Sequence, residues 1–110
     1  MSMQYVASIP DGMPIAARSA VMRLLERAAN VPFLISATHV PISGVRKAGG
    51  GVVEIPSGIC KRDAWLVFLD LCPHAGRAHL CSYYFVDEHG NISEGHNDEY
   101  PPSQEERSVC

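Results

Sequence analysis

The chain has no apolar run long enough to cross a lipid bilayer. Its longest central apolar stretch, Trp65 to Leu69, is far shorter than the roughly 20 residues that a spanning helix needs. The N-terminus, Met-Ser-Met-Gln, lacks the charged and apolar regions of a secretory signal. We therefore expect no contact with a membrane and a cytoplasmic location, where the four cysteines stay reduced.

An excess of positive charge is also missing. Residues 1–93 carry eight basic and seven acidic side chains, a net charge of +1, whereas residues 94–110 carry one basic and five acidic, a net charge of −4. A protein that binds duplex DNA needs a basic face that displaces counterions. The charge distribution therefore argues against duplex nucleic acid as the partner.

Motifs of the common catalytic classes are absent from the sequence. The glycine-rich stretch from Arg46 to Gly51 lacks the Gly-Lys-Ser/Thr ending of a phosphate-binding P-loop. No nucleophile elbow is present, and no cysteine-protease signature surrounds any of the four cysteines. The sequence thus favours binding over catalysis.

Hydrophobic patterning predicts a single domain over residues 1–95. One amphipathic helix is expected over residues 14–29, with Pro14 in its first turn and Asn30 as a left-handed cap. Its apolar stripe recurs at helical spacing and consists of Ala17, Val21, Leu24, Leu25 and Ala28. Residues 43–51 are expected to form a mobile basic loop. Residues 96–110 are polar and acidic and are predicted to form a flexible tail.

Extended segments account for most of the remaining domain. Strands are predicted at 4–9, 33–38, 52–55, 64–71 and 82–86, with a turn at 88–91 that leads into Ile92. The stretch 64–71 is apolar on both faces, which suits a buried central strand, with a short buried helix as the alternative. The order β-α-β followed by a meander predicts a two-layer α+β fold, in which one N-terminal amphipathic helix packs on a mainly antiparallel sheet.

Four potential metal ligands lie within ten residues of one another: Cys72, His74, His79 and Cys81. If Gly76-Arg77 forms a two-residue turn, the two cysteines face each other and so do the two histidines, all on one side of a hairpin. Zinc accepts such a mixed set in tetrahedral geometry. Pro73 opposes this register because it has no N–H for the ladder. A zinc site is thus one hypothesis, ordinary loop and core residues are a second, and a labile disulfide between the two cysteines is a third.

Acidic residues and histidines also gather near the second turn: Asp87, His89, His96, Asp98 and Glu99. Such a group suits an acid–base pair, a weak metal site or a pH-sensitive contact. It suits equally well a solvated turn that leads into a polar tail.

One set of residues could carry acid–base catalysis. It consists of Glu54 on a strand, Arg77 in the hairpin loop, and His79 or His89 on the sheet. In size and in the order of its elements the chain resembles small secreted microbial ribonucleases, which use one helix, an antiparallel sheet and a Glu/Arg/His trio. This resemblance implies a small hydrolase as an alternative function.

Binding to another protein is the function that the sequence favours. In size and charge the chain resembles bacterial immunity proteins and phage-encoded inhibitors, which implies steric occlusion of a partner protein. The expected contact residues are Arg46, Lys47, Arg77, Tyr83 and Tyr84, because arginine and aromatic side chains dominate interface energetics. The aromatic residues, Trp65 included, can serve only if they are exposed. This function needs no cofactor, zinc excepted, and an uncovered sheet edge would also allow a homodimer.

Overall fold

In the computed structural model of the chain, residues 4–72 and 80–103 are described, and they contain one helix and seven strands. The elements follow one another as β1 (Tyr5–Val6), α1 (Ile15–Arg27), β2 (Phe33–Ser36), β3 (Val45–Arg46), β4 (Val52–Val53), β5 (Trp65–Asp70), β6 (Cys81–Val86) and β7 (His96–Asp98).

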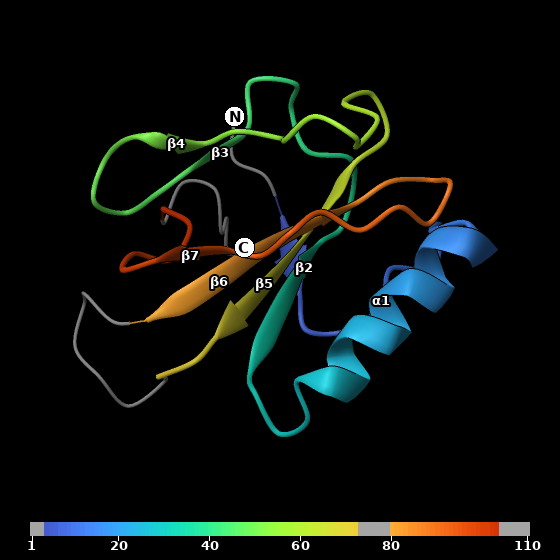
Figure 1. The fold of residues 1–110 in the computed structure, drawn as a ribbon, viewed down its shortest axis with the longest axis horizontal. Coiled ribbons are helices and arrows are strands. Elements are labelled where there is room, and N and C mark those ends of the chain that lie inside the picture. The colour runs from blue at the N-terminus through green and yellow to red at the C-terminus, as the bar shows by residue number, and fades with distance from the viewer. Residues whose placement is uncertain (1–3, 73–79, 104–110) are drawn as a thin grey trace.

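Five of the strands form one antiparallel sheet in the order β1-β2-β5-β6-β7, and β3 pairs with β4 in a separate hairpin. Figure 1 shows α1 on one side of the sheet and the β3–β4 hairpin on the other. The predicted α+β fold, with one N-terminal helix packed on a mainly antiparallel sheet, is confirmed. The hairpin adds a covering layer on the second face.

The helix forms because its apolar residues return to one side every three or four positions. Ala17, Ala20, Val21 and Leu24 are buried, which places them on a single stripe. Asn30 follows with a φ of 67°, the left-handed conformation that asparagine tolerates at a helix end. Within the two described ranges, no helix has the length and apolar character needed to span a membrane.

The central strand β5 is apolar on both faces, and the sheet therefore has a core on each side. Trp65, Val67 and Leu69 pack in the core beneath α1. Leu66 and Phe68 point the other way, into a core that includes Val45 and Val53 of the hairpin. The prediction of a buried strand rather than a buried helix at 64–71 is confirmed.

The pairing of β5 with β6 differs from the predicted register by two residues. Cys81 lies opposite Asp70 rather than Cys72, and the Leu71 N–H donates to the Leu80 carbonyl at 3.2 Å. A shift of two leaves every side chain on its own face, so the apolar alternation does not distinguish the two registers. The observed register pairs Trp65 with Val86 and keeps the Asp70 carboxylate at the strand end, away from the buried centre of β6.

Two other predictions are wrong. Residues 43–51 contain β3, whose Val45 is fully buried, and are not wholly a loop. The predicted tail begins within the sheet instead, because His96–Asp98 form β7 beside β6. Pro102 is also buried. The polar composition misled the prediction because an edge strand needs few apolar side chains; residues 104–110 lie outside the described ranges.

Removing residues 96–110 tests the placement of this segment. A chain that ends at Gly95 should lose about 3 kcal/mol or more of unfolding free energy, because it loses the β7 ladder and leaves polar groups of β6 and β3 without partners. Urea denaturation followed by circular dichroism measures this loss. A shortened chain as stable as the full one would mean that the segment contributes no packing.

Candidate functional site

The four predicted zinc ligands are only partly within the described residues. His74 and His79 lie outside them. Cys72 is exposed, whereas Cys81 is buried on β6, and the observed register places Asp70 opposite Cys81. Among residues 4–72 and 80–103, no three His, Cys, Asp or Glu side chains come together as a metal-binding group.

The predicted partner-binding residues fall in different environments. Arg46 is exposed on β3, and Lys47 is half-buried. Tyr83 is fully buried and Trp65 is only 4% exposed, so neither meets the condition of exposure set for an anchor. Tyr84 is half-buried and packs closely over Gly95; Arg77 lies outside the described residues.

The described part of the structure does not bring together the residues proposed for acid–base catalysis. Glu54 follows β4 and is exposed, and His89 is exposed in the turn after β6. The backbone N–H of His89 donates to the Asp87 carboxylate at 3.0 Å. Arg77 and His79 lie outside the described ranges, so a hydrolase built on this trio stays a prediction.

The acid/histidine group of the C-terminal third separates into two structures. The first is centred on Asp87, which is buried and accepts hydrogen bonds from the backbone N–H groups of Cys60, His89 and Asn91 and from the Asn91 amide. Burial favours the neutral acid, but these hydrogen bonds outweigh it and lower the pKa of Asp87. This carboxylate therefore shapes the turn and fastens the Cys60 loop to it.

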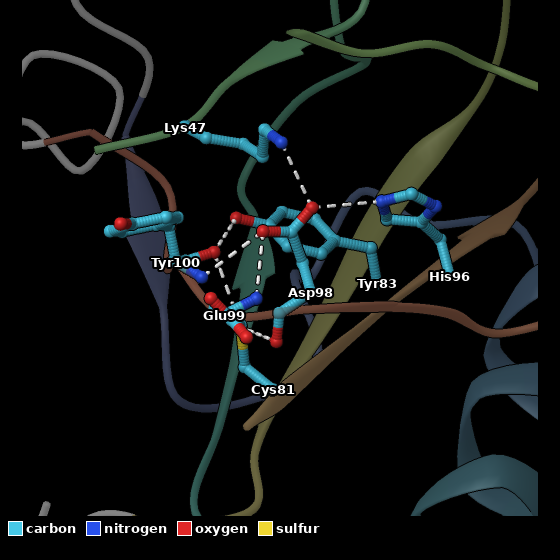
Figure 2. A network of polar contacts seen from close by, with 7 residues as sticks. All are labelled: Lys47, Cys81, Tyr83, His96, Asp98, Glu99 and Tyr100. Carbon is cyan, nitrogen blue, oxygen red and sulfur yellow. Dashed lines mark hydrogen bonds and ion pairs between the residues drawn. The ribbon is translucent and has the colours of Figure 1, made fainter. Parts of the chain in front are cut away.

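The second structure is a polar network centred on Asp98 of β7 (Figure 2). One carboxylate oxygen of Asp98 accepts from Lys47 Nζ and from His96 Nε2, each at 3.0 Å. The other oxygen accepts from the backbone N–H groups of Glu99 at 2.8 Å and Tyr100 at 3.1 Å. Because a carboxylate only accepts, the Nε2 atom of His96 carries the proton in this contact.

These four donors keep the Asp98 carboxylate ionised. Burial alone would raise its pKa, but the hydrogen bonds from Lys47 and His96, with those from the Tyr100 and Glu99 backbone, lower the pKa from 3.8 to about 2. A group that stays ionised to such low pH cannot donate a proton near neutrality. Asp98 is therefore not a general acid in this arrangement.

The Tyr100 carbonyl is the second centre of the network. Tyr83 donates its hydroxyl proton to this oxygen at 2.7 Å, and Cys81 Sγ lies 3.2 Å from it. Burial, followed by the nearby Asp98 and Asp70 carboxylates, raises the pKa of the Cys81 thiol to about 12. The thiol is therefore neutral near pH 7 and is not an activated nucleophile.

The chemistry of the Asp98 network suits the connection of separate segments of the chain. Its carboxylate is ionised and already saturated with donors, and its thiol is protonated. The contact between Lys47 and Asp98 connects the end of β3 to β7. These two residues are 51 positions apart in the sequence. We therefore assign it a positioning role for the β3–β4 hairpin.

His96 and Asp98 were predicted in one acid/histidine group, and Lys47 was predicted separately as a partner-binding residue. One signal was present: His96 and Asp98 are two residues apart, the spacing that puts both side chains on the same face of a strand. The partnership with Lys47 had no local signal.

The pH dependence of stability tests the ionised state of Asp98. Its folded-state pKa of about 2 lies below its unfolded value, so the carboxylate stabilises the fold above about pH 4, and this contribution is lost as the pH falls toward 2. We expect Asp98→Asn to lower the unfolding free energy near pH 7 by on the order of 2 kcal/mol and to flatten its fall between about pH 4 and 2. Glu99→Gln, a substitution at the next position, should show the wild-type dependence of the unfolding free energy on pH. Urea denaturation at each pH measures it.

Zinc titration tests the metal hypothesis. Cys81 could become a ligand only by leaving the core and its contacts with the Asp98 and Tyr100 carbonyls. We therefore expect the reduced protein to bind less than about half an equivalent in competition with a zinc chromophore. Stoichiometric binding that Cys81→Ser abolishes would contradict this expectation.

Comparison with known proteins identifies no relative of this chain. No family model matches the chain, and no curated protein or solved structure is significantly similar to it. The function therefore has to be argued from the chemistry and the exposed surfaces of the chain itself.

Proposed function

We propose that this chain is a small protein-binding domain that acts by steric occlusion of a partner protein, as immunity proteins and phage-type inhibitors do. The proposed contact surface is the outer side of the β3–β4 hairpin, made of Ile42, Arg46 and Val52 and called here the hairpin face. One observation carries the proposal: Ile42 and Val52 are 64% and 47% exposed beside a basic side chain.

Arg46 and Val52 are direct neighbours, and Ile42 lies in the turn that leads into β3. Val52 lies directly opposite Arg46 in the hairpin, and directly opposed residues share a face. A Cβ atom on Gly44 would come within 2.9 Å of Val52 Cγ1, so Val52 lies over Gly44. The Gly44 N–H donates to the Pro41 carbonyl at 2.9 Å, which closes the turn that carries Ile42. The exposed apolar groups thus form a patch with a cation at its side.

The opposite side of the hairpin is part of the core. Val45 is fully buried and Val53 is 4% exposed, and both pack with β5 and β6. The hairpin therefore presents Ile42 and Val52 from a backbone that is already held in place. A surface ordered before binding loses less conformational entropy when a partner docks.

The other two functions gain no comparable support from the described residues. A zinc protein would need the Cys81 thiol, which is buried in the core. A ribonuclease-like hydrolase would need a proton donor, and Asp98 cannot serve as one because it stays ionised near neutrality. A cytoplasmic location and a homodimer through a sheet edge remain part of the proposal.

Charge substitutions on the hairpin face test the function. A carboxylate introduced by Val52→Asp or Ile42→Asp should weaken capture of the partner about tenfold or more, because it would be desolvated in the interface. The measurement is a pull-down with the tagged wild-type chain, followed by titration calorimetry with the protein it captures.

The matched control is Ile15→Asp, since Ile15 is 81% exposed on α1. It should bind as the wild type does, and all three variants should keep wild-type stability because the replaced side chains are exposed. Equal loss of binding in the control, or full binding by Val52→Asp, would place the interface elsewhere.

A further inference from the structure

A short segment at the end of the described chain ties the hairpin to the sheet. Residues 99–103, called here the strap, leave β7 and run alongside β3, where Pro102 lies opposite Lys47. The Ala48 N–H donates to the Pro101 carbonyl and the Ser103 N–H donates to the Arg46 carbonyl, both at 2.9 Å. The strap thus lies beside β3 on the side away from β4.

The two prolines determine how the strap can bond. In this antiparallel pattern the hydrogen bonds flank the pair of Lys47 with Pro102, so the missing N–H of Pro102 costs no ladder bond. Pro101 accepts from Ala48 but has no N–H to return. Within the described residues, side-chain contacts add to the backbone hydrogen bonds made by Ala48 and Ser103.

Three side-chain contacts complete the attachment. Lys47 and Asp98 form an ion pair at 3.0 Å, with both side chains mostly shielded from solvent. The ring of Tyr100 covers Gly49, where a Cβ atom would come within 2.8 Å of the ring carbons. The Tyr83 hydroxyl holds the Tyr100 carbonyl from the sheet side. Figure 2 shows Lys47 and Tyr83 reaching this region from different elements.

The hairpin has few other backbone links to the fold. β3 and β4 contain two residues each and belong to a separate two-stranded sheet. An isolated two-stranded hairpin is marginally stable in water. Its position therefore depends on the strap and on the packing of Val45 and Val53.

We propose that the strap is a lock for the hairpin: while Lys47 and Asp98 are paired, the hairpin is held against the sheet, and when that contact is lost, strap and hairpin open together as one local unit. The opening is transient: it exposes the core face that holds Leu66 and Phe68, while the strand pairing of the five-stranded sheet and α1 stay formed. Its regulatory consequence rests on the proposed function, because an opened hairpin no longer presents the hairpin face in a fixed position. The opening itself does not depend on any partner.

Amide hydrogen exchange of the full chain, resolved by residue, tests the lock. In Asp98→Asn, exchange of the hairpin amides of Lys47 and Ala48 and of the strap amide of Ser103 should accelerate about tenfold or more. The Lys47 amide donates to the Gly51 carbonyl. The Leu66 amide, which donates to Ser36 Oγ within the large sheet at 2.9 Å, should have a larger opening free energy than these three amides in both proteins, because it opens only by global unfolding. Glu99→Gln is the control that leaves Lys47 paired.

A second variant reaches the lock from the hairpin. Gly49→Ala puts a methyl group against the Tyr100 ring, and it should accelerate the same amides as Asp98→Asn does. Gly12→Ala, with nothing within 4 Å of its added methyl group, should leave them unchanged. Gly49→Ala and Gly12→Ala leave every side chain of the large sheet in place, so both variants should fold.

Two results would overturn the lock. One is wild-type exchange at Ala48, Lys47 and Ser103 in both variants. The other is an opening free energy at these three amides equal to that at Leu66 in the wild-type protein, which would show global rather than local opening. Neither result involves a partner, so failure of the lock is distinguishable from failure of the proposed function, which the Val52→Asp and Ile42→Asp binding measurements decide.

Discussion

The antiparallel pairing of β5 with β6 requires a cover on each face of the sheet. Trp65 and Val67 alternate with Leu66 and Phe68, so neither face can be left in water without exposing a row of large apolar side chains. The helix covers one face because its own stripe is apolar. The second face is covered by the excursion between β2 and β5, which carries the β3–β4 hairpin.

The second cover is much less self-sufficient than the first. A helix satisfies its own backbone hydrogen bonds, whereas a hairpin with strands of two residues leaves most of its backbone to be satisfied elsewhere. The strap supplies part of what is missing, and the Asp98 carboxylate gathers Lys47, His96 and two backbone N–H groups around it. This demand explains why ionisable side chains concentrate at the junction of β3 and β7.

Lysine, aspartate, histidine, tyrosine and cysteine in one cluster resemble the ingredients of an active centre. Their protonation states argue for a structural role instead, since Asp98 is ionised and fully bonded while the Cys81 thiol is neutral and buried. Tyr83 and Trp65 are likewise used in the interior. The exposed apolar groups that remain for binding are aliphatic; among them, Val52 lies opposite Arg46 on the covering hairpin, and Ile42 lies in the turn before β3.

The sequence alone determined the features that depend on near neighbours. The helix around Ala17, Val21 and Leu24 follows from apolar residues at helical spacing. The strand from 64 to 71 follows from a short apolar run with a β-favouring run at 82–86 soon after it. The fold class followed from their order. The left-handed conformation of Asn30 after the helix followed from the tolerance of asparagine for that conformation.

Tertiary structure decided everything that joins distant segments. The sequence did not determine the register of β5 with β6, because a shift of two residues leaves every side chain on the same face. The strand β7 was missed because a polar edge strand has the composition of a loop. The Lys47–Asp98 contact spans 51 residues, and no local pattern specifies a partner at that distance. Such contacts form only when folding brings distant segments together. The candidate surface was therefore found from the fold and not from a motif.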